Sequence, residues 1–358
     1  MESPITGKEM QVRREVAALS FRKEEFKIIS HYYFCEDSGE KFTNDNLDNL
    51  NLNQVYNQYR EKYGIPFPDE IRQLRTMYDV SASKMSEILG LGPNSFRLYE
   101  AGEMPSVAIG RLLLSIKQPA QFIKQVKASS HLLTPKETDR LLRKGESLMI
   151  DQKNHEWDII LTDKIFESSQ PCEYNGYRVP DLHKISNMIC YFNDVKQIQL
   201  YKTKLNKLLF YADFNSYKLS GYSMSGMKYR AIQFGPVPSH FDKLYIKLCD
   251  DGQLTVNEKD FGNGYYGDEI QSKSAFNDSY FSKVEISILE SVAEMLGELS
   301  TDEIVKESHE ESGWKENHES RSLISYKYAF ELAKAINCKF DIASDLSKKG
   351  YEIEHDSN

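Results

Sequence analysis

The 358-residue sequence lacks the features that mark several common protein classes. It has no apolar run of about 18 residues, so we expect no membrane span. Its N-terminus lacks the pattern of a secretory signal. Its five cysteines are an odd number without the spacing of a disulfide framework. These absences predict a cytoplasmic protein with reduced thiols and no membrane partner.

Positive charge is also scarce. Lys and Arg number 45 against 54 Asp and Glu, which gives a formal net charge of −9. This balance argues against a protein that coats nucleic acid indiscriminately, because such binding depends on cations that neutralise phosphates. Residues 201–247 are nevertheless mainly basic, and residues 298–320 are mainly acidic. The asymmetry indicates either a partner face or ordinary salt bridges between solvated helices.

No clear catalytic constellation is present in the sequence. His309 and His318 are spaced neither for one helical face nor for a zinc motif. Cys190 or Cys249 beside one of them would imitate a Cys–His nucleophile pair, but both lie in apolar helical runs, where inert buried thiols are more common. We therefore expect no catalysis and no cofactor, with an enzyme that carries a DNA-targeting domain left as an alternative.

Amphipathic helices are what the sequence does contain. Residues 65–127 show four short ones, with Ser81 and Ser106 as caps and a Gly-Leu-Gly turn at 90–92. The main apolar positions are Ile71, Leu74, Met77, Met85, Ile88, Leu89, Phe96, Tyr99, Ile109, Leu112, Leu113 and Ile116. This arrangement predicts a helix-turn-helix DNA-binding domain.

The predicted recognition helix is PNSFRLYE, residues 93–100. Asn94 carries an amide suited to adenine, Arg97 a guanidinium suited to guanine or phosphate, and Ser95 lies close enough to assist. The predicted phosphate contacts are Lys84, Lys117, Lys124 and Lys127. Because the domain is only weakly basic, the alternative is a helix-turn-helix that has lost DNA binding and only dimerises.

Residues 1–64 alternate at strand period and predict a small β unit. SPITGKEM and YYFCEDSGEKF resemble the zinc-finger half of the MqsA antitoxin family, and residues 1–127 together resemble an MqsA-type antitoxin with a Cro-like DNA-binding half. The family's two Cys-x-x-Cys pairs are matched by Ser3 and Thr6 and by Cys35 and Ser38. One thiolate among three hydroxyls does not supply four zinc donors, so we predict no metal.

The recognition helix departs from the pattern of that family, Asn-x-Phe-x-Arg-Tyr. Leu98 stands where the family has Arg, and Arg97 lies one position early. The resemblance therefore carries over Asn94 more directly than Arg97. Residues 128–165 follow as a helical connector, whose main helix begins with Thr134, Pro135 and Glu137 as cap, first-turn proline and capping-box acid.

Residues 201–248 change period several times. Leu205, Leu208, Leu209 and Ala212 form an apolar stripe that Gly221 ends. A strand over 229–234, a rigid turn at 235–238 and a helix capped by Ser239 and Asp242 are predicted to follow. Further along, residues 250–270 predict an acidic hairpin or loop, and residues 326–336 a last apolar helix.

Three ordered motifs in this half resemble the Panacea domain, the SocA-like antitoxin domain of bacteria and their viruses. They are KLLFYAD at 207–213, Tyr229 and Ala231 leading into GPVP at 235–238, and SHEESGW at 308–314. The resemblance implies a domain over residues 166–358 that neutralises, by protein binding, a toxin encoded beside it. The candidate partner-binding residues are Tyr211, Asp213, Tyr229, Gln233, His309 and Trp314. The first four are either buried hydrogen-bonding residues or partner contacts.

Together these observations predict a mainly α protein with a small N-terminal β unit, a helix-turn-helix and a largely helical α+β Panacea domain. The predicted function is a homodimeric antitoxin that neutralises a cognate toxin protein and represses its own operon by binding operator DNA. The alternatives are a protease adaptor that delivers a bound client and a plain DNA-binding transcriptional regulator.

Overall fold

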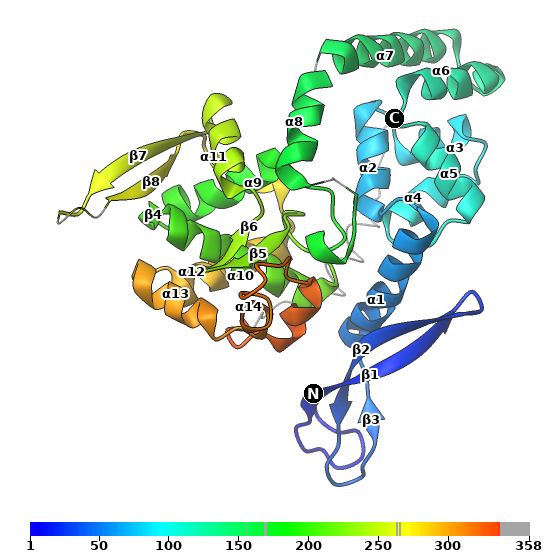
Figure 1. Ribbon diagram of the computed structural model, residues 1–358. Coiled ribbons are helices and arrows are strands. Elements are labelled where there is room, and N and C mark those ends of the chain that lie inside the picture. The colour runs from blue at the N-terminus through cyan, green and yellow to red at the C-terminus, as the bar shows by residue number, and fades with distance from the viewer. Residues whose placement is uncertain (155, 168–169, 263, 265, 337–358) are drawn as a thin grey trace. The chain divides into compact units, whose positions relative to one another are not determined.

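The computed structural model describes residues 1–154, 156–167, 170–262, 264 and 266–336 (Figure 1). The chain divides into two compact units, Met1–Ile160 and the described part of Leu161–Asp345. Helices predominate and the strands form small antiparallel sheets, which confirms the predicted mainly α class. None of the described helices combines the length and apolar content needed to cross a bilayer.

The first unit begins with a hairpin and a long helix. β1 (Gln11–Phe21), β2 (Glu24–Phe34) and β3 (Lys41–Phe42) form an antiparallel sheet in that order. α1 (Asp45–Tyr63) follows, capped by Asn44, whose side chain accepts a hydrogen bond from the Leu47 N–H. The prediction of a β unit over residues 1–64 missed this helix, because its sequence is rich in Asn, a weak helix former, and lacks a clear apolar stripe.

Side-chain amides join α1 to the outer edge of β2. Asn51 and Gln54 each accept from a backbone N–H of β2 and donate to the C=O of the same residue, at 2.9–3.0 Å. Gln58 donates to a third carbonyl at 2.9 Å. The β2 residues that they bond are His31, Ile29 and Lys27, in that order. The three amides lie on one helical face and occupy the place of a further strand.

Four short helices follow and share a core. They are α2 (Pro68–Met77), α3 (Ala82–Ile88), α4 (Ser95–Glu100) and α5 (Val107–Ser115). Ser81 and Ser106 cap α3 and α5 through their hydroxyls, as predicted. The buried side chains include Ile71, Leu74, Met85, Ile88, Phe96 and Leu113. The helical pattern of the sequence is thus confirmed as secondary structure in this region.

The remaining helices of this region are α6 (Pro119–Ala128), the short turn η1 (Ser130–Leu132), α7 (Pro135–Asn154) and α8 (Glu156–Phe166). The predicted cap of α7 is confirmed: Thr134 Oγ1 accepts from the Glu137 N–H at 3.2 Å, and Glu137 Oε2 accepts from the Thr134 N–H at 2.9 Å. Tyr78 stacks on Phe122 with ring centroids 3.6 Å apart, which fixes α6 to the helical core.

The second unit is built around α10 (Lys202–Ser220) (Figure 1). Its other helices are α9 (Leu182–Cys190), α11 (Phe241–Asp250), α12 (Lys283–Leu296), α13 (Thr301–His309) and α14 (Ser312–Lys315), with helical turns η2 (Glu173–Asn175), η3 (Tyr191–Val195), η4 (Asp278–Tyr280) and η5 (Tyr326–Glu331). β4 (Leu200–Tyr201), β7 (Leu254–Asp260) and β8 (Tyr266–Ser272) form one sheet in the order β4-β8-β7, and β5 (Tyr229–Ile232) pairs with β6 (Gly235–Pro238).

α10 is buried on every side. All residues from Lys204 to Tyr217 are buried, since β6, α12, α13 and η5 pack around the helix. The predicted stripe of apolar residues is therefore buried, and so are the polar residues between them. Gly221, with a φ of 78°, ends α10 as predicted and donates its N–H to the Tyr217 carbonyl at 2.8 Å.

The prediction of a turn at 235–238 is wrong, because these residues form strand β6. The turn lies one step earlier, at Gln233 and Phe234 between the paired residues Ile232 and Gly235. Pro236 and Pro238 are tolerated because their partners in β5 direct hydrogen bonds to the other side of that strand. There the Ala231 N–H donates to the Ser322 carbonyl and the Tyr229 carbonyl accepts from the Ile324 N–H.

Two predicted helix features are also corrected. α11 begins at Phe241 after His240, which has a φ of 52° and forms no side-chain cap, so Ser239 and Asp242 do not cap it. Of residues 326–336, only Tyr326–Glu331 is helical, as a 3-10 turn. The chain then leaves the helix because later N–H groups donate to α10 and to the α13–α14 junction rather than to the preceding turn. These donors are Ala333 and Lys334, to Glu311, and Ile336, to Asn215.

Candidate partner-binding site

Asp213 is the centre of a buried hydrogen-bond network on α10. Its carboxylate accepts from the backbone N–H groups of Met224 and Ser225 at 2.8 and 2.7 Å, from Ser225 Oγ at 2.5 Å and from Tyr229 Oη at 2.7 Å. Burial raises the pKa of Asp213, which these four donors oppose, and raises the pKa of Tyr229 well above its ordinary value. The network ties α10 to the loop after it and to β5.

Tyr211 holds a second internal contact. Its hydroxyl donates to Glu311 Oε1 at 2.9 Å, and the Glu311 carboxylate also accepts from the N–H groups of Ala333 and Lys334. Burial raises the pKa of Tyr211, and the neighbouring carboxylate adds to the shift. Tyr211, Asp213 and Tyr229 are all 0% exposed. These three candidates therefore lie in the interior of the second unit.

His309, Trp314 and His318 form a stack of three rings. Trp314 lies 3.8 Å from His309 and 4.4 Å from His318 between ring centroids, with interplanar angles of 13° and 17°. The Trp314 indole N–H donates to the Ile232 carbonyl at 2.7 Å. Desolvation and the nearby Lys207 lower the pKa of His309, so its imidazole is neutral at pH 7. The stack supports the β5–β6 turn.

The β5–β6 turn is also held from inside by Lys207, a residue that the sequence analysis did not single out. Its ammonium group is fully buried and donates to the Pro236 carbonyl at 3.0 Å. Burial lowers the pKa of Lys207 to about 7. Gly235 is required here: its φ is 92°, and a Cβ would lie 2.3 Å from Ser308 Oγ and 2.5 Å from Lys207 Cε. The sequence signal that could have identified Lys207 is its position as a lysine inside an apolar helical run.

The segment that carries most of these contacts matches a known family model. Residues 205–315 match the family model described as antitoxin SocA-like, Panacea domain. The match runs from α10 to α14 and includes Tyr211, Asp213, Tyr229, Gln233, His309 and Trp314. It supports a role related to toxin–antitoxin systems. Comparisons with curated proteins and with solved structures found no match.

Residues 205–315 are called the Panacea segment below, and Gln233 differs from the buried candidate residues in it. It is exposed in the two-residue turn, together with Phe234, whose exposed fraction is 59%. His309 and Trp314 are half-buried directly behind this turn. The structure therefore separates the six candidates into an internal group on α10 and β5 and a group at the surface.

The candidate DNA-binding residues lie at the start of α4 in the first unit. Asn94 and Arg97 are exposed, Ser95 is half-buried, and Asn94 forms no side-chain cap. Phe96 and Tyr99 point inward as predicted, and the Phe96 N–H donates to Ser86 Oγ at 3.1 Å. The helix therefore presents its polar residues at the surface.

Lys84, proposed as a phosphate contact, is already engaged within the first unit. Its ammonium group lies 2.7 Å from Glu87 and 3.2 Å from Glu137. These carboxylates raise the pKa of Lys84 and neutralise its charge. Its contribution to DNA binding would require these ion pairs to open.

The four positions matched to zinc ligands do lie together. Ser3 Oγ donates to Cys35 Sγ at 3.2 Å, and Thr6 Oγ1 lies 3.8 Å from the same sulfur. Hydrogen bonds from Ser3 and then Ser38 lower the pKa of Cys35 to about 6. Three hydroxyls thus surround one thiolate, a donor set unsuited to structural zinc. Among the residues described, no group of three or more His, Cys, Asp or Glu side chains is arranged to hold a metal.

Of the two thiols considered as nucleophiles, Cys190 is buried and Cys249 is half-buried. Cys190 is 0% exposed, and its Sγ donates to the Ser274 carbonyl at 3.0 Å. Burial raises the pKa of both Cys190 and Cys249. A raised pKa keeps a thiol protonated at neutral pH, which disfavours nucleophilic attack.

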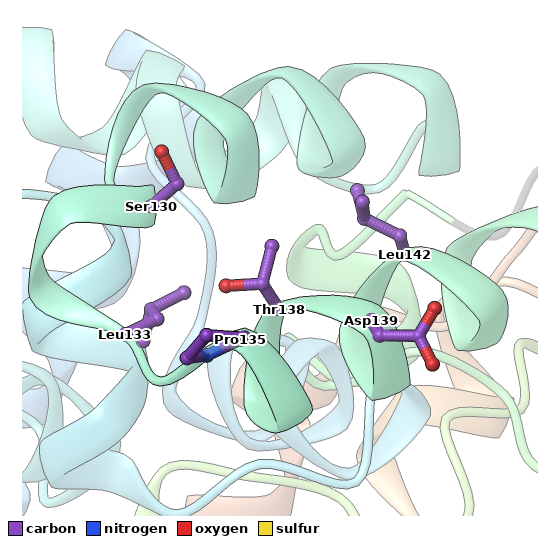
Figure 2. Close-up of a pocket in the computed structure, with 6 residues that line it drawn as sticks. All are labelled: Ser130, Leu133, Pro135, Thr138, Asp139 and Leu142. Atoms are coloured by element: carbon purple, nitrogen blue, oxygen red, sulfur yellow. The ribbon is translucent and has the colours of Figure 1, made fainter.

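A shallow hollow of about 400 Å³ lies at the start of α7. Figure 2 shows its lining residues, with the Ser130 hydroxyl and the Asp139 carboxylate on opposite sides. Asp139 is paired with Arg143 at 3.0 Å. The lining residues are Ser130, Leu133, Pro135, Thr138, Asp139 and Leu142. The only carboxylate in this lining, that of Asp139, is paired and does not point into the hollow (Figure 2). The lining therefore contains no group of catalytic residues that point toward one another.

Proposed function

We propose that this chain is an antitoxin that binds a cognate toxin through its Panacea segment. The observation that carries the proposal is the family match over residues 205–315. The internal contacts support it, because Asp213 joins α10 to β5, Tyr211 joins it to the α13–α14 junction, and Lys207 holds the strand after the β5–β6 turn. A rigid surface favours stoichiometric binding to a protein partner, since less conformational entropy is lost on association.

The proposed partner contacts are the surface members of the candidate set, Gln233, His309 and Trp314. Tyr211, Asp213 and Tyr229 position them from inside the segment. The toxin would be neutralised because its active surface is covered, with no chemical step by this chain and no cofactor. The proposed arrangement of the chain is a β unit without zinc at 1–64, a DNA-binding domain at 65–127, a connector at 128–165 and the toxin-binding domain at 166–358.

The second part of the proposal is repression of the chain's own operon. Asn94, Ser95 and Arg97 would read the operator from the start of α4 in the major groove. A homodimer in the cytoplasm would place two such helices one turn of DNA apart, on the order of 34 Å. Support comes from the exposure of Asn94 and Arg97 on a helix whose apolar side is buried.

The test uses the protein encoded by the neighbouring reading frame, expressed with and without this chain. The expected result is growth arrest that only the chain relieves, accompanied by a complex that co-purifies. An Asp213→Asn variant, which disturbs the buried network, should lose rescue together with stability. Absence of toxicity, or toxicity that the wild-type chain does not relieve, would contradict the proposed function.

A further inference from the structure

Phe234 is an exposed aromatic residue in a segment whose other rings mostly form the core. Its exposed fraction is 59%, whereas Phe210, Phe214 and Tyr229 are each 1% exposed or less. An exposed phenyl ring forgoes the free energy that burial of its apolar surface would provide. Within the Panacea segment, this ring lies at the tip of a turn that internal residues support.

The backbone on both sides of Phe234 is fixed. The Trp314 indole donates to the Ile232 carbonyl at 2.7 Å on one side, and Lys207 donates to the Pro236 carbonyl at 3.0 Å on the other. Gly235, next in the chain, is packed too closely for any side chain. A ring presented by so constrained a turn loses little conformational entropy when it is bound, as is typical of an interface anchor.

The chemistry around the turn favours a protein as the partner. Gln233 offers an uncharged amide, and the neutral His309 lies behind it. The adjoining helices carry charges of both signs: Lys306 is followed by Glu307, and Lys315 pairs with Glu310 at 2.7 Å. Nucleic acid requires a concentration of cations to neutralise phosphates, which this surface does not offer.

We infer that Phe234 is the anchor of the toxin-binding surface. Its ring enters an apolar pocket on the toxin, and Gln233 bonds to the rim of that pocket. This assignment rests on the proposed function. The occupant is a folded protein with a concavity that accepts one phenyl ring. Aromatic anchors in fully desolvated pockets commonly dominate the binding energy of such interfaces.

The experiment compares full-length chains that carry Phe234→Ala, Phe234→Leu or Tyr266→Ala. Tyr266 is the matched control because it is 61% exposed and belongs to β8. Affinity for the neighbouring-frame protein and rescue of growth are measured for each. Phe234→Ala should weaken binding about thirtyfold or more, and Phe234→Leu should weaken it less. Tyr266→Ala should match the wild type, and melting temperatures should show that all three variants fold.

A second measurement does not depend on an alanine variant. Benzoylphenylalanine placed at position 234 should cross-link to the neighbouring-frame protein on illumination, and the same group at position 266 should not. If the wild-type chain binds and rescues but Phe234→Ala does so equally well and position 234 gives no cross-link, the anchor assignment is overturned while the proposed function stands. If the wild-type chain neither binds nor rescues, the proposed function and this assignment are both overturned.

Discussion

At the scale of single residues, the polar side chains of α10 explain why the helix is surrounded on all sides. Asp213, Tyr211 and Lys207 each direct a charged or polar group to a specific backbone or side-chain partner in a neighbouring element. Buried polar groups cost free energy unless they are paired, so each contact selects one arrangement of the elements. Helical periodicity identified the apolar residues of α10 but gave no indication of these partners.

Asp213→Asn should destabilise the protein by about 2–4 kcal/mol. The amide nitrogen of Asn is a donor, and it would face groups that donate hydrogen bonds to the carboxylate of Asp213. Chemical unfolding of the full chain measures the difference. Asp302→Asn, at an exposed position in the first turn of α13, is the matched control and should change stability by less than about 0.5 kcal/mol. Equal stability of the two variants would show that the Asp213 network is not required for the fold.

Lys207→Met should change how stability depends on pH. Burial lowers the pKa of Lys207 from 10.5 to about 7, so between these values the unfolded chain binds a proton that the folded chain does not. Wild-type stability therefore gains a contribution, at most about 1.4 kcal/mol per pH unit, as the pH rises above about 7.

The Lys207→Met variant should lack this gain, so its stability should rise less than that of the wild type between pH 7 and pH 9. At pH 7 the variant should be more stable than the wild type. Thermal unfolding across this range provides the measurement. Lys243→Met, which removes an exposed lysine of α11, is the matched control. Parallel pH profiles for Lys207→Met and the wild type would contradict a lowered pKa of the buried Lys207.

At the scale of elements, local signals predicted several helix ends correctly, but not the start of α11, and predicted strand pairings poorly. Ser81, Ser106, Thr134 and Gly221 end or begin helices where expected, because a cap acts within one turn. β6 was missed because a strand tolerates proline only where the opposing residue directs its hydrogen bonds to the other side. That direction depends on the tertiary structure and cannot be seen in the local sequence. α1 was missed for a similar reason: the amides of Asn51 and Gln54 bond to β2, a strand that helical periodicity does not reveal.

The amide contacts of α1 give a graded prediction. Asn51→Leu should destabilise the first unit by about 1–3 kcal/mol, because it removes both hydrogen bonds that Asn51 makes to the buried backbone of His31. Gln58→Leu is the matched control, since the bond of its amide to the Lys27 carbonyl is exposed to water and its other bond is to the Gln54 carbonyl within α1, and it should cost less than about 0.5 kcal/mol. Similar losses for the two variants, by chemical unfolding, would count against a structural role for the amides.

At the scale of the whole molecule, the chain combines two units whose proposed tasks are different. The sequence predicted the Panacea motifs and the residues that surround them, since three ordered motifs are specific. It did not separate internal from surface members of the candidate set, because burial of Tyr211, Asp213 and Tyr229 arises from elements distant in sequence. Nor did it single out Phe234, whose exposure depends on where the β5–β6 turn falls.

The two proposed tasks should be separable by substitution. Asn94→Ala should weaken binding to the chain's own promoter about tenfold to a hundredfold and relax its sequence preference, without changing affinity for the toxin. Phe234→Ala should have the opposite pattern. Gel-shift and calorimetric titrations of the full-length variants measure both affinities. Unchanged promoter binding by Asn94→Ala would remove Asn94 from the DNA-reading residues.

If this chain neutralises its partner by forming a stable complex, cells whose growth it restores should still contain the partner, and the abundance of the partner in those cells tests this. The neighbouring-frame protein is induced with and without this chain, and its abundance and co-purification are followed together. We expect restored growth with the partner undiminished and held in a stoichiometric complex. Restored growth with disappearance of the partner would contradict it and identify a protease adaptor instead.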